Sequence, residues 1–524
     1  MIPGYITTNA PALLIAVPLL GAFLSPLIGR ISRDTRALWV LAVMTLTTLI
    51  GYLTAFLVYT EGTLIYVFGA SEATLAIPPD SGGIPIRIIF TLDAMSALMV
   101  TIAVTVGFAV ILYSLTSDAR RSGLEAYYTI FLLMIGAVLG MVSTGDLFNF
   151  FVFLEISSLA SAGLVAYKVE NGRAVEAGLK YLLVSTIGGI FFLFAIGILY
   201  GQYNALNMAM LADMIQWTPL DKLALVLVVA ALAAKCGAVP MHFWTPDAYS
   251  MAPSAVTAML VVASQASLYG LFRICFTLYG ITLNYVTIGW VIIILGILSM
   301  IIGVTMAIPQ KDIKRLMAYH AVSQTGYMLL GVGVGLAVLG DQALLNSYGM
   351  TAMEGGIFHI FNHAMYKGLL FLTAGAIIYQ VGTSDLNRMG GLGHRMKWTM
   401  IFFIIGALAI AGIPPFNGFA SKFLIYESVF AFSPILSVIA MVVSILTLAS
   451  FVKVFHSVFM GPPLPGNEQV REAPHTMLIG MTILAAIVII SGIFPEFFVQ
   501  NLVSPAAHAL TDQAGYISAV LGGA

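Results

Sequence analysis

The stretch AAKCGAVPMHFWTPDA, residues 233–248, lies within a long apolar segment and decides how the chain folds. Lys235 places a charge among residues that suit lipid, and Pro240 interrupts the helix that such residues form. A charge at the centre of a bilayer costs about 2.5–3.5 kcal/mol on insertion scales. A broken helix is tolerated at that depth only where protein or a water-filled cavity surrounds it. The stretch therefore predicts a functional polar site inside a membrane protein.

The composition of the whole chain agrees with a protein that is dissolved in lipid. The 524 residues are 60% hydrophobic and 9% charged, whereas a soluble protein carries roughly 25% charged residues. The net charge of -1 gives no case for a nucleic-acid partner. Cys236 and Cys275 form no CxxC motif, so neither disulfide nor cluster chemistry is indicated. The N-terminus MIPGYITTNA has no basic region, which favours a retained first helix over a cleaved signal peptide.

Apolar segments of about 20 residues, the length that crosses a bilayer, recur along the chain. We predict an all-α polytopic membrane protein with about fourteen spans. The loop GASEATLAIPPDSGGIPIRIIF, residues 69–90, alternates in polarity and predicts a small β-hairpin. The predicted spans are 10–30, 37–59, 93–117, 125–145, 146–168, 174–200, 221–249, 253–278, 283–308, 312–337, 346–380, 398–430, 434–461 and 474–500.

Basic residues test this count, because Lys and Arg gather on cytoplasmic loops. If the N-terminus is outside, only Arg87 and Lys222 fall on outer loops. We therefore predict a multi-pass protein of the cell membrane with both termini outside. The basic residues on the predicted cytoplasmic loops are Arg30, Arg33, Arg36, Arg120, Arg121, Lys168, Arg173, Lys311, Lys314, Arg315, Arg388, Arg395, Lys397 and Arg471.

The remaining basic residues fall within predicted spans. Arg273 is near the outer end of its helix and could reach the surface by snorkelling. Lys453 is near the inner end of its helix and could do the same. Lys180 is intermediate in depth. Three lysines are too far from either surface, and we interpret them as functional, with helix–helix adhesion as the alternative; they are Lys235, Lys367 and Lys422.

One acidic residue has the same character. Glu155, in DLFNFFVFLEISSLASAG, sits halfway along its span. An unpaired buried carboxylate takes up a proton and an unpaired buried lysine loses one, whereas a pair keeps both groups charged. A pair of this kind is a switchable proton site.

Three polar residues share one face of a later helix. The stretch FHIFNHAMYKG spaces His359, His363 and Lys367 four residues apart. Histidines four apart can bind metal, but Lys367 stands where a carboxylate ligand is wanted, and haem is no better supported. We predict a proton-carrying stripe without metal, because histidine titrates near neutrality. His320, in LMAYHAVSQTGY, adds a titratable group, although a packed neutral histidine is also open there.

A second helix break resembles the first. GIPPFNGFASKF, with Pro414 and Pro415, interrupts a span before Lys422, as Pro240 interrupts one after Lys235. Paired interruptions in two halves of a chain point to a transport site in an inverted-repeat protein. The sequence offers no set of residues typical of hydrolysis, so no catalytic residues are predicted.

Together these stretches resemble the antiporter-like subunits shared by respiratory complex I, Mrp-type sodium/proton antiporters and energy-converting membrane-bound hydrogenases. The resemblance covers essentially the whole chain and implies fourteen helices, with two inverted five-helix bundles (spans 4–8 and 9–13) and discontinuous seventh and twelfth helices. The implied parts are 1–124 (first three helices and hairpin), 125–278 (first bundle), 279–461 (second bundle) and 462–524 (last helix and tail). The stretches that carry the resemblance are FLEISSLAS, EAGLKYL, AAKCGAVPMHFWTPDA, KDIKRLMAYHAVSQTGY, FNHAMYKGLLFL and GIPPFNGFASKF.

The resemblance also implies roles for individual residues. Glu155 and Lys235 correspond to an ion pair on helices five and seven, and Lys422 to a helix-twelve lysine near the outer exit. The region of His359 and His363 corresponds to a central polar axis. We therefore expect a proton to pass along Lys180, the histidine stripe and Lys422.

At one position the sequence departs from this family pattern. Many relatives carry a lysine on helix eight where SQASLYGLFR has Gln265, which cannot titrate. Ser264, Gln265 and Ser267 could hold a water wire in its place, or the ion handled here could differ.

The function implied is that of a proton- or sodium/proton-translocating subunit of a redox-driven complex, such as a membrane-bound hydrogenase or a complex I relative. The chain itself would have no cofactor. Its partners would be further antiporter-like subunits, small membrane subunits and hydrogenase-like or iron–sulfur subunits. Two alternatives stay open: a subunit of a dedicated Mrp-type antiporter without redox partners, and a scaffold whose lysines anchor lipids or quinone.

Overall fold

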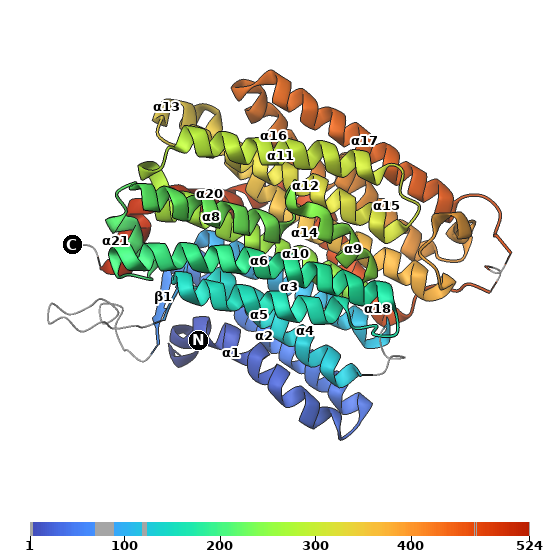
Figure 1. Cartoon of the computed structure of the whole chain (residues 1–524). Coiled ribbons are helices and arrows are strands. Elements are labelled where there is room, and N and C mark those ends of the chain that lie inside the picture. The colour runs from blue at the N-terminus through green and yellow to red at the C-terminus, as the bar shows by residue number, and fades with distance from the viewer. Residues whose placement is uncertain (1–3, 69–87, 118–122, 466, 468, 523–524) are drawn as a thin grey trace.

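The computed structural model describes residues 4–68, 88–117, 123–465, 467 and 469–522. Long helices run side by side through the molecule (Figure 1). Within the described residues, twelve helical segments are long and apolar enough to cross a membrane. The predicted class, an all-α polytopic membrane protein, is confirmed. The twelve segments are Tyr5–Gly29, Arg33–Glu61, Ala94–Ser117, Ala126–Ser143, Leu147–Val165, Gly172–Tyr203, Pro219–Met251, Ser254–Thr282, Tyr285–Ala307, Gln342–Val381, Pro434–Phe459 and His475–Ile493.

The two other predicted spans also fall on helices. The span predicted at 312–337 coincides with α12 (Ile313–Ala337), which has 25 residues. The span predicted at 398–430 is divided between α15 (Lys397–Ala411) and α16 (Asn417–Phe432). All fourteen predicted positions are therefore helical.

The remaining helices keep the order of the sequence. The first group is α1 (Gly4–Gly29), α2 (Arg33–Glu61), α3 (Ala94–Ser117), α4 (Leu124–Ser143), α5 (Leu147–Val165), α6 (Gly172–Tyr203), α7 (Met208–Met214), α8 (Pro219–Cys236) and α9 (Trp244–Met251). The second group is α10 (Ser254–Arg273), α11 (Tyr285–Ala307), α13 (Gln342–Leu344), α14 (Met350–Val381), α17 (Pro434–Phe459), α18 (His475–Ile493), α19 (Pro495–Phe498), α20 (Ser504–Thr511) and α21 (Gln513–Leu521).

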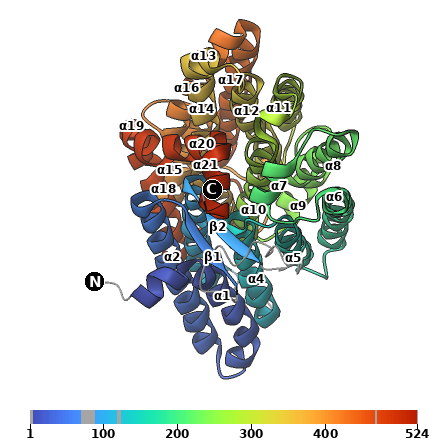
Figure 2. The same cartoon turned by 90° about the vertical axis from the view of Figure 1, so that its left-hand side faces the viewer.

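A short antiparallel hairpin joins α2 to α3. Its strands are β1 (Leu64–Val67) and β2 (Ile89–Leu92), with Leu64 opposite Leu92 (Figure 2). The strands flank the loop for which a hairpin is predicted, and residues 69–87 of that loop lie outside the described residues.

The bundle has two distinct ends. At one end, which we call the basic-loop end, Lys168, Lys314 and the turn at 382–384 line one cavity of about 530 Å³. At the other end β1, α13 and α21 lie together, at the left in Figure 1. Lys168, Lys314 and residues 382–384 belong to loops that are predicted to be cytoplasmic, whereas β1, α13 and α21 belong to segments that are predicted to be outside. The two groups therefore lie at opposite ends of the bundle.

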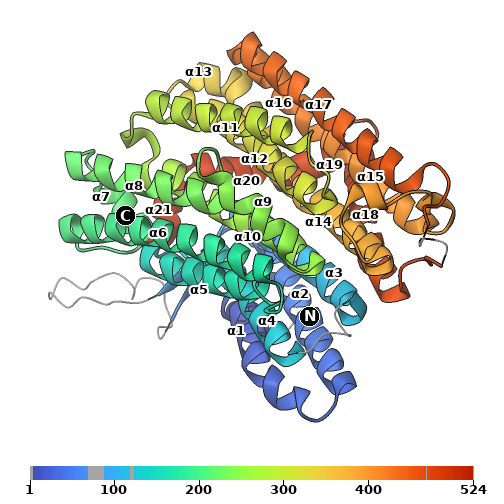
Figure 3. The ribbon, with the colours of Figure 1, turned by 45° about the vertical axis from the view of Figure 1, so that its right-hand side comes forward.

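Helix α14 forms the centre of the molecule. It packs against α3, α10, α12, α15, α16 and α18 (Figure 3). Nearly all its residues from Ala352 to Ile377 are buried. Polar side chains on α14 are therefore surrounded by protein, which lowers the cost of placing them at membrane depth.

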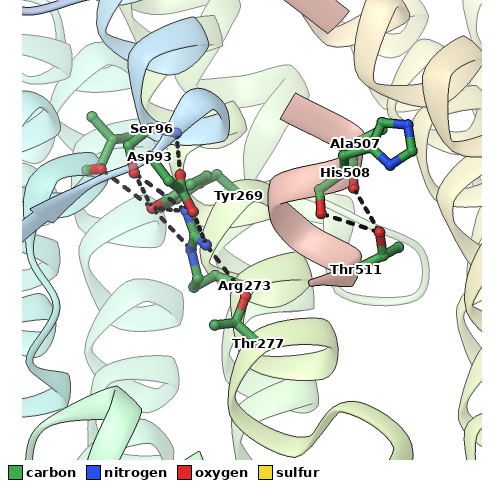
Figure 4. Close-up of polar contacts among 9 residues, drawn as sticks. Asp93, Ser96, Tyr269, Arg273, Thr277, Ala507, His508 and Thr511 are labelled. Atoms are coloured by element: carbon green, nitrogen blue, oxygen red, sulfur yellow. Dashed lines mark hydrogen bonds and ion pairs between the residues drawn. The ribbon is translucent and has the colours of Figure 1, made fainter. Parts of the chain in front are cut away.

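The expectation that Arg273 snorkels to the surface is wrong. Its side chain is only 3% exposed and forms a bidentate ion pair with Asp93, with both nitrogen–oxygen distances 2.6 Å (Figure 4). Its guanidinium also donates to the hydroxyls of Ser96, Tyr269 and Thr277. Asp93 precedes α3, so this pair ties α3 to α10 inside the protein, and the fork geometry of arginine suits such a buried site.

Lys453 is held at the protein surface. Its ammonium donates to the carbonyls of Ile308 and Gln310 at 2.6 and 2.9 Å, just beyond the end of α11. A cation at a helix C-terminus satisfies carbonyls that have no partner within the helix. These contacts give Lys453 a structural role.

Candidate functional site

The first helix break places Lys235 next to the end of α8. Gly237 adopts a left-handed conformation (φ 75°), which glycine tolerates best, and its N–H donates to the carbonyls at the end of α8. Pro240 follows at the start of the turn that leads to α9. The indole of Trp244 donates to the Ala234 carbonyl at 2.9 Å. The backbone groups freed by the break are thus satisfied within the protein.

Lys235 forms the predicted ion pair with Glu155. Its ammonium donates to Glu155 Oε1 and to Ser158 Oγ, each at 2.7 Å. The lysine side chain is 3% exposed and that of Glu155 is 25% exposed. Glu155 and Ser158 lie three residues apart on α5, so both face α8. If the carboxylate moves away, the buried ammonium keeps only the hydroxyl of Ser158 as a partner.

Helix α6 presents two glycines, Gly188 and Gly189, to the Glu155–Lys235 pair. A Cβ atom at Gly189 would lie 2.2 Å from Glu155 Oε1, well inside van der Waals contact. At Gly188 a Cβ would lie at an ordinary 3.5 Å from Lys235 Cγ. The bare backbone at Gly189 therefore provides the space in which the Glu155 carboxylate sits.

Gly189→Ala is expected to push the Glu155 carboxylate away from Lys235. Ion translocation should fall by roughly tenfold or more, since breaking a buried ion pair costs about 3–5 kcal/mol. Translocation is measured as proton movement in vesicles that carry the whole complex. Gly197→Ala is the matched control, because a Cβ there meets nothing within 4 Å on the same helix. Equal rates in the two variants would contradict the prediction.

The second helix break forms the site of Lys422. Helix α15 ends before Gly412, which is also left-handed (φ 77°), and Pro414 and Pro415 follow. The Lys422 ammonium donates to the Ile410 carbonyl at 2.7 Å and to Ser444 Oγ at 2.8 Å. Carbonyls at a helix C-terminus carry partial negative charge and attract a cation. The break thus supplies an acceptor for this lysine.

Aromatic contacts surround the same ammonium. Lys422 is fully buried and its Nζ lies 4.7 Å from the centre of the Tyr327 ring, within the range of a cation–π interaction. Within the described residues no carboxylate lies at ion-pair distance from it. Neutral groups alone hold this lysine, in contrast to Lys235.

The histidine stripe contacts helix α16 one residue before Lys422. His359 Nδ1 lies 2.9 Å from Ser421 Oγ, and Ser421 directly precedes Lys422. His359 Nε2 lies 3.1 Å from Gln324 Oε1 and 3.2 Å from the Tyr366 hydroxyl. These side chains come from α12, α14 and α16, so the polar contacts join three helices.

Gln265 joins the stripe from α10. Its Nε2 donates to the Ile360 carbonyl at 2.9 Å and to His363 Nδ1 at 2.8 Å. The rings of His363 and His359 lie 6.5 Å apart between centres. A series of polar groups therefore runs from Gln265 past both histidines to Ser421, the residue before Lys422.

A small cavity lies between this chain and the first helix break. Its volume is about 10 Å³, close to the minimum that holds one water molecule. Ser264 lines it, but Ser267 does not, because the Ser267 hydroxyl bonds the Ala263 carbonyl of its own helix. The residues that line the cavity include Cys236, Thr245, Tyr249, Ser264, Gln265, Thr325 and His363.

Gln265→Leu is expected to reduce translocation several-fold, because leucine removes both hydrogen bonds that join α10 to α14. Gln265→Lys should be tolerated, since an amine can donate to the same two acceptors. Proton movement in vesicles compares the two, with Ser267→Ala as a control on the same helix. A fully active leucine variant would mean that no proton passes Gln265.

His320 and Lys367 both lie next to Phe451. The His320 ring is 5.0 Å from the Phe451 ring between centres, and Lys367 Nζ is 5.9 Å from that centre. Within the described residues, neither His320 nitrogen nor Lys367 Nζ has a hydrogen-bond partner. An unsatisfied buried polar group costs about 1–3 kcal/mol, and the contacts of these two groups are with aromatic rings.

Lys180 lies apart from these groups. It forms ion pairs with Glu176 (2.7 Å) and Asp247 (3.0 Å) and is 44% exposed. Asp247 also pairs with Arg315 at 2.5 Å, and all four residues line a cavity of about 340 Å³ near the basic-loop end. Asp247 and Arg315 are not among the site residues predicted from the sequence, although the acid in WTPDA directly after the helix break is a visible signal.

The described residues contain no group of three or more His, Cys, Asp or Glu side chains that could hold a metal ion. Cys236 and Cys275 are both buried and free. The site therefore consists of titratable and hydrogen-bonding side chains, a composition suited to moving protons.

Comparison with known proteins identifies this arrangement. Residues 144–447 match the family described as NADH:quinone oxidoreductase/Mrp antiporter, transmembrane. NADH-quinone oxidoreductase subunit N of Desulforudis audaxviator is 32% identical over 521 residues, which cover 95% of this chain and 98% of that protein.

Two solved structures share the fold. A chain of the Mrp complex from Dietzia sp. DQ12-45-1b superposes with a TM-score of 0.85 at 27% identity, covering 99% of this chain and 100% of that one. A chain of the membrane-bound sulfane sulfur reductase, an archaeal respiratory membrane complex, gives 0.83 at 28% identity, covering 98% and 100%. The chain is thus an antiporter-like membrane subunit that belongs to the NADH:quinone oxidoreductase/Mrp antiporter family, as its sequence motifs predict.

Proposed function

We propose that this chain moves protons, or exchanges protons for sodium, as a subunit of a redox-driven complex in the cell membrane. The observation that carries the proposal is the Lys235 ammonium held between Glu155 and Ser158 at 2.7 Å. The polar chain from Gln265 to Lys422 gives a proton released near this pair a route through the second half. The chain has no cofactor of its own in this scheme.

The first step of the mechanism is the separation of Glu155 from Lys235. Breaking a buried pair costs about 3–5 kcal/mol, so opening and closing it changes the proton affinity of both groups by a comparable free energy. Carrying one charge against 100 mV requires about 2.3 kcal/mol. The free-energy change that accompanies the opening of one pair is therefore larger than the free energy needed to move one proton across the membrane.

The proton then follows the polar contacts of the second half. It crosses the small cavity beside Gln265, moves between His363 and His359, and reaches Lys422. Lys180, near the basic-loop end, is the group that receives protons from the inner side. His320 and Lys367 form a branch of the same route beside Phe451.

The two halves are proposed to be inverted repeats, residues 125–278 and 279–461. The two helix breaks support this division, because each begins with a left-handed glycine and continues with a proline, and each is accompanied by a buried lysine within ten residues of the chain. Residues 1–124 and 462–524 would flank these two bundles, with both termini outside the cell.

The partners proposed are further antiporter-like subunits, small membrane subunits and, in the redox-driven case, hydrogenase-like or iron–sulfur subunits. A dedicated Mrp-type antiporter without redox partners is the second candidate, and the likeness to the Mrp complex chain supports it. The likeness to subunit N and to the sulfane sulfur reductase supports the redox-driven complex equally.

Purification through a tag on this chain tests the two candidates. A redox-driven complex should bring down subunits with iron–sulfur absorbance, and its electron donor should start proton uptake in vesicles. A dedicated antiporter should lack that absorbance and should show sodium-dependent proton movement under an imposed gradient. A chain that moves no ions in either preparation would refute the proposal.

Single cysteines test the proposed orientation. A cysteine at Asn387, on the basic-loop end, should react with a membrane-impermeant maleimide only from the cytoplasmic side. A cysteine at Gln216, between α7 and α8, should react only from outside. The background should be low, because Cys236 and Cys275 are buried. The opposite labelling pattern would invert the topology.

A further inference from the structure

Asp247 connects the two halves of the chain. Its Oδ2 pairs with Lys180 of α6 at 3.0 Å and its Oδ1 with Arg315 of α12 at 2.5 Å. Helix α6 lies in the proposed first bundle and α12 in the second. One carboxylate thus bridges cations on both sides of the division, and its side chain is only 21% exposed.

The helix that carries Asp247 is also fixed to the end of α8. Helix α9 has 8 residues, and Trp244 at its start donates to the Ala234 carbonyl, directly before Lys235. A Cβ at Gly237 would lie 2.6 Å from Thr245 Oγ1, so the start of α9 packs closely against this helix end. Asp247 is one helical turn beyond Trp244. A shift of the α8 end therefore displaces Asp247.

The other end of the bridge leads to the polar chain of the second half. Arg315 lies in the first turn of α12, which is buried along nearly its whole length. The same helix carries Gln324, which contacts His359, and Tyr327, whose ring lies under Lys422. A displacement of α12 therefore changes the geometry of both contacts.

From these contacts we propose that Asp247 is a positioning residue that couples the opening of the Glu155–Lys235 pair to the proton route of the second half. The proposal rests on the proposed function. It assigns Asp247 no direct contact with the transported ion. Its two ion pairs transmit the movement of α8 and α9 to α12.

Asp247→Asn in the intact complex is the first test. Asparagine keeps the size of the side chain but removes the charge that holds both cations. The maximal translocation rate should fall about tenfold, within the range of coupling between linked sites, while the apparent affinity for the ion stays unchanged. Asp247→Glu should recover most of the rate, because the cavity of about 340 Å³ has room for one more methylene.

Glu176→Gln is the matched control. It removes the other acidic partner of Lys180 but leaves the contact between Asp247 and Arg315 in place. Its rate should stay near that of the wild type. An Asp247→Asn variant as active as Glu176→Gln would overturn the proposal.

A double-mutant cycle identifies the route of the coupling. If Asp247 acts through Arg315, the double variant Asp247→Asn/Arg315→Gln should be no slower than Asp247→Asn alone. Spin labels at Arg173 and Lys311 should also show a broader distribution of distances between α6 and the start of α12 in Asp247→Asn but not in Glu176→Gln. Additive rate losses, or an unchanged distance, would overturn the proposal.

These results separate the proposal from the proposed function. If Glu155→Gln is inactive and Asp247→Asn is fully active, the ion pair drives transport and Asp247 does not couple it. If Glu155→Gln is itself fully active, the proposed function fails first.

Discussion

Glu155→Gln and Lys235→Ala should each reduce ion translocation by the assembled complex to near background. Glutamine is neutral, so Lys235 would keep a hydroxyl and an amide as partners and would lose the acid whose movement changes its proton affinity. Alanine removes the group that accepts and releases the proton. Proton movement in vesicles measures the loss, and the amount of assembled complex shows whether folding is preserved.

Ser158→Ala is the control for this pair of variants. It removes one hydrogen bond to the same ammonium but leaves the 2.7 Å ion pair intact. A hydrogen bond to a charged group contributes about 1.5–3 kcal/mol, so a smaller, partial effect is expected. Wild-type translocation in either charge variant would show that the pair is structural.

Lys422→Ala should produce a loss of similar size. Lys422 is the titratable residue next to Ser421, which contacts His359, so without the lysine the polar series would end at the histidine. The variant should still assemble, because the Ile410 carbonyl lies at a helix break where a water molecule can replace the ammonium. Proton release on the outer side is the measurement.

Ser444→Ala tests whether the effect comes from the lysine itself. It removes one acceptor of Lys422 and leaves the Ile410 carbonyl and the Tyr327 ring in place. Its rate should fall only a few-fold. If Lys422→Ala translocates as fast as Ser444→Ala, the proton leaves by a route that avoids this site.

The main parts of the site could be predicted from the sequence because charge in an apolar segment is a strong signal. Lys235 and Lys422 are buried, Glu155 pairs with Lys235 although its side chain is 25% exposed, and both proline-containing breaks are present. In lipid each of these features is costly, so chance does not retain many of them. The resemblance to known family motifs then assigned these residues to particular helices.

Other features could not be read from the sequence because they depend on tertiary contacts. The partner of Arg273 is Asp93, 180 residues earlier in the chain, and snorkelling was an equally valid expectation for an arginine near a helix end. Ser158 and Gln324 are ordinary polar residues until the fold brings them to Lys235 and His359. Asp247 acquires its importance only from the packing of α9 between α6 and α12.

The unequal exposure of Glu155 and Lys235 gives the switch a direction. A quarter of the Glu155 side chain faces outward from the wall of α5, next to the exposed side chains of Phe148 and Leu159, whereas Lys235 faces the interior. A charge on a neighbouring chain can pull on the acid without entering this one, and the amine then passes the signal inward. In the proposed function, the flank of α5 would thus receive the input and the core would give the output, an arrangement that suits units connected in series.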